Sequence, residues 1–243
     1  SKDFGDFSTK LILGFSAFKT GYNAMNSAAS ALVIPELYNI SNRLGEPIAT
    51  QETLERSSMG VFADATIGYK NYIFLHASAR NDWDSRLVED NRSFFYPGAD
   101  ISAVLTDMFP ALKDSPVFSF LKVKKKKKKT GQIALNNWYA TVPRYDAAPG
   151  FPYGNTAGFR LNGTLSNPNL RPEITKEIEG GIEMSFVKDR YHLEVTAYKS
   201  NTVDQTIPAS ISSATGYRSA YINAGELETK GIETDLKLTP LLN

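Results

Sequence analysis

The sequence predicts an all-β protein, an antiparallel transmembrane β-barrel meander. Apolar and polar side chains alternate with a period of two over segments longer than ten residues. Very short connections between these segments alternate with much longer ones. Strands of soluble proteins usually have about 5–6 residues. Membrane barrels instead join strands of about ten residues through tight turns at one end and long loops at the other.

Residues 61–82 form the first predicted hairpin. Its turn, Lys70-Asn71, has the two-residue length of a tight β-hairpin connection. One face of the hairpin is apolar and built from small or branched side chains, whereas the other face is polar. The apolar face comprises Val61, Ala63, Ala65, Ile67, Tyr69, Ile73, Leu75, Ala77 and Ala79.

Residues 174–198 repeat this design around the turn Lys188-Asp189. Farther along, Leu227 falls on the polar side of the alternation, which predicts a β-bulge just upstream of Gly231. With the remaining periodic segments, eight strands are expected. Their ranges are 5–20, 54–69, 72–83, 94–105, 118–131, 173–187, 190–206 and 217–238. The longest gaps are therefore 21–53 and 132–172.

Two features favour lipid over a protein interior as the environment of the apolar faces. These faces use many alanines, which a close-packed core uses sparingly. Aromatic side chains also lie near the expected strand ends, as in the aromatic girdles of membrane barrels. They are Tyr69, Trp83, Phe95, Phe186 and Tyr191. A soluble secreted β-sandwich that binds or cleaves polysaccharide is the first alternative, and a passive porin or adhesin barrel is the second.

The composition excludes several other classes. The chain is 42% apolar and 12% aromatic, which is incompatible with a disordered chain. It contains no cysteine, so disulfides and thiolate chemistry are excluded. The net charge is +1, and without the six lysines Lys124–Lys129 it would be 21 − 26, or −5. An acidic remainder argues against a nucleic-acid partner.

The lysine run itself falls inside the predicted strand 118–131. With a period of two, three of the six lysines must face lipid. A lysine at the midplane of a membrane barrel costs about 2–4 kcal/mol. Three cost roughly 6–12 kcal/mol, comparable to the whole stability of a domain. We therefore hypothesise that Lys124–Lys129 stands in for other residues; a solvated basic tract is the alternative.

No pattern in the sequence predicts catalysis, a cofactor or a metal. His76 and His192 have no second histidine at a metal-ligand spacing. Glu177, Glu179 and Glu183 alternate along one strand and are interpreted as a wet inner wall. We expect no catalytic residue, no cofactor-binding residue and no metal site, and therefore no enzyme.

Ligand contact is expected in two places. The long gap 132–172 concentrates aromatic and arginine side chains among prolines and glycines, and such side chains stack on sugar rings or peptide groups and donate forked hydrogen bonds. Packing of the loop on itself or on a partner is the alternative role for these residues. The candidates in the loop are Trp138, Tyr139, Arg144, Tyr145, Phe151 and Tyr153. Arg80 and Asp82, near the top of a strand, are expected to line the upper lumen.

An ordered set of motifs resembles the SusC/RagA family of TonB-dependent transporters over nearly the whole chain. The segment "NPNLRPE" (167–173) is followed by "NAGELETKGIE" (223–233). Upstream, "SARNDWDSRL" (78–87) precedes "FFYPGADISAVLTDMF" (94–109). No single motif is specific for this family, but the occurrence of all of them in this order is.

The resemblance implies a barrel of roughly 22 strands in the outer membrane of Bacteroidota-type bacteria, with loops at the cell surface. Residues 1–243 would be part of the barrel wall, with the plug domain and the TonB box lying outside this range. The family imports oligosaccharides or oligopeptides with energy delivered by the TonB complex. The implied partners are a SusD-like surface lipoprotein, membrane lipid and the glycan or peptide cargo, with no nucleic acid.

Overall fold

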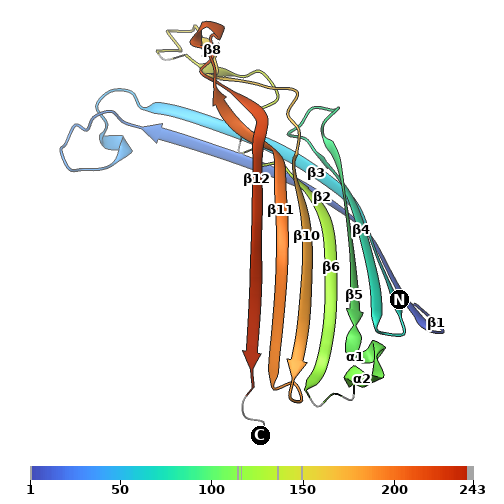
Figure 1. The fold of residues 1–243 in the computed structure, drawn as a ribbon. Helices are drawn as coiled ribbons and strands as arrows, with labels where there is room; N and C mark the ends of the chain where they lie inside the picture. The colour runs from blue at the N-terminus through green and yellow to red at the C-terminus, as the bar shows by residue number, and fades with distance from the viewer. Residues whose placement is uncertain (1, 114, 116, 136, 149, 240–243) are drawn as a thin grey trace.

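The computed structural model describes residues 2–113, 115, 117–135, 137–148 and 150–239. Figure 1 shows one tall, curved sheet whose outer connections rise above it. The sheet has ten strands in the order β1-β2-β3-β4-β5-β6-β10-β11-β12-β9, while β7 and β8 pair separately. All neighbours are antiparallel except β12 and β9. Within the described residues, no helix is long and apolar enough to span a bilayer.

Eight of the strands are long and form the meander that the sequence predicts. They are β2 (Phe7–Ala28), β3 (Ile48–Tyr69), β4 (Ile73–Asp84), β5 (Ser93–Val104), β6 (Phe118–Gln132), β10 (Glu173–Phe186), β11 (Tyr191–Ser210) and β12 (Ser219–Leu238). The short elements are β1 (Lys2–Phe4), β7 (Tyr145–Ala147), β8 (Phe159–Leu161), β9 (Thr164–Leu165), α1 (Leu105–Met108), α2 (Pro110–Lys113), and the 3₁₀ turns Ile40–Asn42 and Ser213–Thr215.

The prediction of a loop over 21–53 is wrong. β2 and β3 stay paired from Phe7↔Tyr69 up to Ala28↔Ile48, so the loop shrinks to 29–47. Residues 21–28 and 48–54 are mostly exposed, and neither segment presents an apolar face. The backbone hydrogen bonds between β2 and β3 continue into these segments, although the sequence there has no hydrophobic alternation that would predict a strand. In Figure 1 this hairpin reaches well beyond the rest of the sheet.

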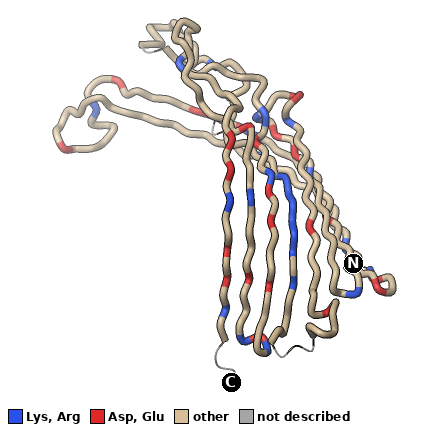
Figure 2. Tube along the Cα trace, viewed as in Figure 1, with Lys and Arg blue, Asp and Glu red and all other residues tan. Residues whose placement is uncertain are grey.

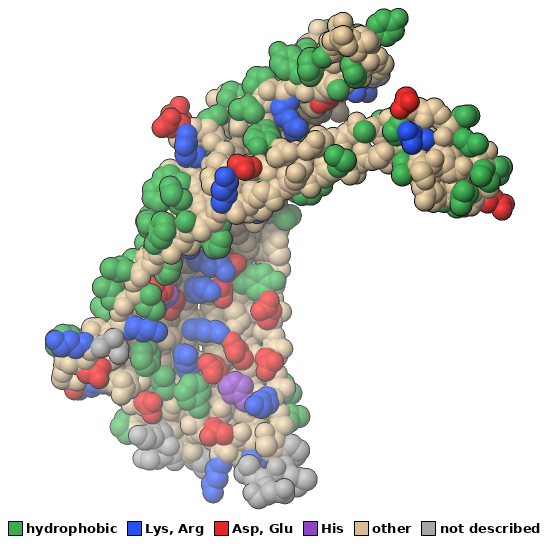
Figure 3. Space-filling model, turned by 180° about the vertical axis from the view of Figure 1, so that it is seen from behind, with side chains coloured by type: hydrophobic (Ala, Val, Ile, Leu, Met, Phe, Trp, Pro, Cys, Tyr) green, Lys and Arg blue, Asp and Glu red, His purple; other side chains and the backbone are tan. Residues whose placement is uncertain are grey.

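The register separates the two faces of the sheet. One row across the wall joins His76, Asp100, Lys126, Glu179 and Tyr198. The adjacent row, on the opposite face, joins Leu75, Ile101, Lys125, Gly180, Ala197 and Ile232. Figure 3 shows side chains of both charges and a histidine gathered in the hollow of the sheet. The polar face is therefore the concave, inner one.

The apolar face remains uncovered by any other layer of the described residues. Leu13, Phe15, Ile101, Ile232 and Leu236 are among its exposed side chains. A soluble β-sandwich would bury this face against a second sheet. The exposed apolar face of this single sheet agrees with a wall wetted by lipid.

The lysine run lies within β6, as the strand prediction requires, and appears as an unbroken blue stretch in Figure 2. Its inward members each meet a carboxylate. Lys126 lies 2.9 Å from Glu179, and Lys128 lies 2.7 Å from Glu177. Lys124 pairs with Glu194, and just before the run Lys122 lies 3.7 Å from Glu183. The glutamates interpreted as a wet wall are thus one side of a charge ladder.

The outward members of the run, Lys125, Lys127 and Lys129, share a face with Ile178 and Ala197. No carboxylate of the described residues lies within 4.0 Å of their ammonium groups. The free-energy cost of placing charged lysines in lipid therefore arises from these three outward side chains and not from the three inward ones. The hypothesis that other residues belong here stays a prediction, and it now applies most strongly to these positions.

The expected bulge is confirmed at the β11–β12 pair. The register shifts between Thr202↔Leu227 and Thr206↔Asn223, a few residues upstream of Gly231. Asp204 in the bulge has a φ of 57°, a left-handed conformation that aspartate tolerates better than most residues.

The inner ladder predicts a measurable coupling between Lys126 and Glu179. Lys126→Gln and Glu179→Gln in the intact barrel should each lower the free energy of unfolding. The coupling should be only about 0.5–1 kcal/mol because both side chains are partly solvated. Denaturant unfolding in detergent measures it as a double-mutant cycle. The same cycle with the unpaired, exposed Glu36→Gln should be additive, and additivity for Lys126 with Glu179 would contradict the ladder.

Peptide sequencing by mass spectrometry across Phe120–Gln132 tests the lysine run. Chymotryptic cleavage after aromatic residues keeps the run intact, whereas trypsin would destroy it. The hypothesis expects residues other than lysine at positions 125, 127 and 129. Six confirmed lysines would reject it and would require a binding partner for the outward ammonium groups.

Candidate binding surface at the outer rim

The loop after β6 is fastened to the barrel rim by Arg86. The Arg86 backbone and side chain donate three hydrogen bonds of 2.8–3.0 Å to the carboxylate of Asp84. The remaining guanidinium nitrogen, Nη1, donates to the backbone carbonyls of Ile133 (3.1 Å) and Leu135 (3.4 Å). The hydroxyl of Thr141 donates to the Arg86 carbonyl at 3.2 Å.

Asp84 ends β4 at the outer rim and is almost fully buried. Burial raises the pKa of its carboxyl, but the hydrogen bonds and the charge of Arg86 lower it more, so the pKa lies below its usual value. Asp84 therefore stays ionised and keeps Arg86 aimed at the loop.

A small hydrophobic cluster sits beneath the loop. Leu170 is 0% exposed and packs with Leu87, Leu135 and Ala140, flanked by Ile133 and Tyr221. This cluster joins the segment after β4, the start and end of the long loop, and β12. Four of the six buried apolar residues in the described part of the chain lie in this cluster, so the close-packed core is at the rim and not inside the wall.

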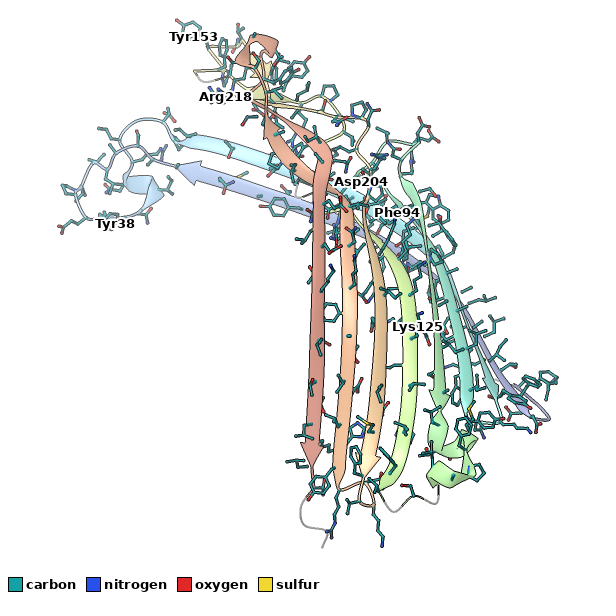
Figure 4. All side chains as sticks on the ribbon, viewed as in Figure 1. Tyr38, Phe94, Lys125, Tyr153, Asp204 and Arg218 are labelled. Carbon is teal, nitrogen blue, oxygen red and sulfur yellow. The ribbon has the colours of Figure 1, made fainter. Side chains whose placement is uncertain are left out.

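The side chain of Asn223 forms the second fastening. It accepts a hydrogen bond from the Arg171 backbone N–H and donates to the Arg171 carbonyl, both at 2.9 Å. It also donates to the Asp204 carbonyl at 2.7 Å. Arg171 in turn forms a 3.1 Å ion pair with Asp204 (labelled in Figure 4). In the sequence analysis, Arg171 and Asn223 served only as parts of motifs that resemble a family. Their role in holding the loop end against β11 and β12 was not predicted.

Three of the six predicted loop residues pack against β3. The guanidinium of Arg56 lies 5.1 Å from the ring of Trp138. The hydroxyl of Tyr139 accepts a 3.1 Å hydrogen bond from the Glu55 N–H. Arg144 stacks on Tyr139 and pairs with Glu52 at 3.9 Å. The contacts of these three residues therefore fit the alternative role, in which the side chains pack the loop and do not contact a ligand.

The other three lie farther out, around the β7–β8 hairpin. Tyr145 is 65% exposed and Tyr153 80% exposed, while the ring of Phe151 packs over Gly158, where a Cβ would come within 2.4 Å of it. The register Tyr145↔Leu161 and Ala147↔Phe159 puts Phe159, 70% exposed, on the same face as Tyr145. Sequence reasoning missed Phe159, although alternation around Arg160 could have indicated it. Tyr153 marks this outermost position in Figure 4.

Arg80 and Asp82 lie on the inner wall below the rim, as expected, but they neutralise each other. Arg80 Nε donates to Asp82 at 2.7 Å, and its Nη2 donates to Ser16 at 2.9 Å. The hydroxyl of Tyr96 donates to the other oxygen of Asp82. Beside this network is a recess of about 450 Å³, with Gly98 and Ser78 in its lining.

Below the recess, His76 bridges Asp64 and Asp100. Its Nε2 and Nδ1 lie 2.6 Å from the two carboxylates. Each ring nitrogen is within hydrogen-bonding distance of a carboxylate oxygen, so the imidazole can bridge the two acidic side chains. The bridge joins β3, β4 and β5 across the inner wall.

The Asn223 fastening predicts a loop that opens when this side chain is removed. Asn223→Ala should cost about 1–3 kcal/mol because it leaves the Arg171 and Asp204 backbone groups without their partner. Cleavage of the folded barrel within 137–161 by an added protease should accelerate about tenfold or more, since cleavage follows the open population. Asn155→Ala, in the same loop and exposed, should leave the rate unchanged. Equal rates for the two variants would contradict the fastening.

Comparison with known proteins agrees with this geometry. The family model described as "TonB dependent receptor-like, beta-barrel" matches residues 2–243. TonB-dependent receptor P3 of Formosa agariphila is 24% identical over 100% of this chain and 24% of that protein. TonB-dependent receptor SusC of Bacteroides thetaiotaomicron is 26% identical over 80% of this chain and 19% of that protein. The chain thus spans about a quarter or less of the length of these relatives.

Solved structures share the fold. The RagAB peptide importer in its "closed-closed" state superposes with a TM-score of 0.84 and 21% identity, covering 100% of this chain and 26% of that one. The outer membrane transporter YddB from Escherichia coli superposes with a TM-score of 0.63 and 13% identity, covering 99% of this chain and 29% of that one. The chain belongs to the TonB-dependent receptor-like β-barrel family and is a segment of barrel wall in the bacterial outer membrane.

Proposed function

We propose that this chain is part of the wall and outer rim of a SusC-like importer that moves oligosaccharides or oligopeptides across the outer membrane with TonB-delivered energy. The observation that carries the proposal is the family match over residues 2–243, and the separate 26% identity to SusC over 80% of the chain supports it. No bond of the cargo is broken. The energy enters through segments outside this chain that contact the TonB complex.

The rim geometry supports a division of labour in the outer loop. Trp138, Tyr139 and Arg144 hold the loop against β3, whereas Tyr145, Tyr153 and Phe159 are free to meet cargo or a lid. Aromatic faces suit both sugar rings and peptide side chains, because both offer flat apolar surfaces. A SusD-like surface lipoprotein would close over this rim.

The inner wall supports passage of polar cargo. Its charges are paired among themselves, so a glycan or peptide meets hydrogen-bonding groups without a strong field of one sign. Arg80, Asp82 and Tyr96 line the upper part of this path. A passive porin would share such a wall, so the energy requirement distinguishes the two functions.

Uptake by cells that carry the complete transporter tests the proposal. Labelled oligosaccharides and labelled oligopeptides are supplied in separate experiments. Uptake of the pool that contains the cargo should stop when an uncoupler collapses the proton gradient. Uptake that survives the uncoupler would identify a passive pore and overturn the proposal.

The exposed aromatic side chains predict a change in apparent affinity. Tyr145→Ala combined with Tyr153→Ala and Phe159→Ala should raise KM at least about tenfold, because three lost aromatic contacts at roughly 0.5–1.5 kcal/mol each sum to about 1.5 kcal/mol or more. The maximal rate should change little. Phe4→Ala, an exposed aromatic at the opposite end of the sheet, is the matched control. An unchanged KM in the triple variant would remove these residues from cargo contact.

A further inference from the structure

The outer face of the wall carries a basic patch that import of cargo does not use. The strand register brings lysines from four strands together on this face. Lys129 lies opposite Lys176, and the next row of the same face joins Lys127, Ile178, Lys199 and Lys230. We call Lys125, Lys127, Lys129, Lys176, Lys199 and Lys230 the outward lysine patch. Figure 2 shows blue positions on β6, β11 and β12 at similar levels.

The patch is on the lipid side and near the cell-surface end of the apolar band. Its members share parity with the exposed Ile182 and Leu236. Lys199 is eight residues along β11 from Tyr191, and Lys176 is ten residues along β10 from Phe186. At about 3.3 Å per residue these are roughly 26 and 33 Å along tilted strands. The apolar band of an outer-membrane barrel is about 25 Å tall. At a strand tilt of about 40° these lengths are heights of roughly 20 and 25 Å, so the backbone at Lys199 and Lys176 lies in the upper part of the band. Their long side chains extend the remaining few ångströms toward the outer headgroups.

The patch remains positive after its internal ion pairs are counted. Glu228 contacts both Lys199 (2.7 Å) and Lys230 (2.6 Å). Among the described residues, no carboxylate lies within 4.0 Å of the ammonium groups of the other four lysines of the patch. Glu226 also lies at this face, because it accepts a 2.9 Å hydrogen bond from Asn201, which is opposite Lys176. Two carboxylates against six ammonium groups leave a formal charge of +4, and without the three lysines of the run the remaining lysines leave +1. Charged groups at a lipid surface need counter-charges, which anionic headgroups supply.

A shallow groove runs through the patch. Gly180 and Ala197 form its floor, with nothing within 4 Å of the position that a Gly180 Cβ would occupy. Lys125, Ile178 and Lys199 border it, and the space is about 490 Å³. The groove offers an apolar bed, and the lysines offer point charges suited to phosphate. This combination matches an acyl chain attached to a phosphorylated headgroup.

We propose that the outward lysine patch binds a phosphorylated lipid of the outer leaflet, with phosphate on the lysines and an acyl chain over Gly180 and Ala197. The proposal extends beyond cargo import and depends only on the chain being an outer-membrane barrel wall. It also supplies the partner that outward lysines on β6 need if the run is native. Lys176, Lys199 and Lys230 lie outside that run, so the patch can be tested without knowing the identity of residues 124–129.

The test compares two triple variants of the intact transporter in detergent. Lys176→Gln/Lys199→Gln/Lys230→Gln removes patch charges. Lys2→Gln/Lys10→Gln/Lys237→Gln changes the net charge equally at sites off the patch. Native mass spectrometry measures retention of added diphosphorylated lipid A, and the heat-induced gel shift of folded barrels verifies that both variants fold.

The patch variant should retain the lipid about a hundredfold more weakly, since each lysine near an anionic lipid surface contributes roughly a factor of five. The control variant should match the wild type. Lipid A stripped of its phosphates should bind the wild type as weakly as the patch variant, and millimolar inorganic phosphate should not displace the intact lipid. Equal retention by the two variants, or full retention of the dephosphorylated lipid, would overturn the proposal. Displacement by inorganic phosphate would assign the patch to free anions instead.

Discussion

This structure depends on one hydrogen-bonded β-sheet that has lipid on one face and water on the other. In hydrocarbon every backbone N–H and C=O needs a partner, so only neighbouring strands can complete a β-wall. The side-chain period of two then sorts residues between the faces. Ile178 and Glu179 are consecutive, yet one meets lipid and the other pairs with Lys126. In the complete barrel, strands outside this chain would pair with the parts of the β2 and β12 edges that β1 and β9 leave open.

The wall has no interior, so close packing is displaced to the rim. The cluster around Leu170 and the fastenings by Arg86 and Asn223 give the long outer loop a fixed base. The hairpin β7–β8 projects from that base and carries the exposed aromatic residues. A rigid base with an exposed tip lets a surface loop present side chains to a ligand without ordering the whole loop at the moment of binding. The charge ladder lies on the inner face of these eight strands, and the outward lysine patch lies on their outer face.

Much of the fold could be predicted from the sequence because hydrophobic alternation and turn length directly reflect the ladder. The eight strands, the places of the tight turns and the bulge near Gly231 all follow from local pattern. The two-residue length predicted for the turns is wrong, because Tyr69 pairs with Ile73 across residues 70–72 and Phe186 pairs with Tyr191 across residues 187–190. Residues 21–28 of β2 and 48–53 of β3 could not be predicted as strand, because beyond the lipid neither face of the hairpin needs apolar residues. The candidate site was only partly predictable. Aromatic composition pointed to the loop, but contacts of Trp138 with Arg56 and of Tyr139 with Glu55 span more than 80 residues and leave no local signal.

The most direct measurement is a single-cysteine scan of residues 176–184 on β10 in the intact transporter, which is practical because this chain has no cysteine of its own. Each cysteine would be labelled with a water-soluble thiol reagent and, separately, with a fluorophore quenched by brominated lipid. A wall with water on one face and lipid on the other predicts strict alternation, with odd positions reactive from water and positions 178, 180, 182 and 184 quenched by lipid. Position 176, at the headgroup level, should be quenched less. Water reactivity at both parities, or quenching at Glu177, Glu179 and Glu183, would contradict it.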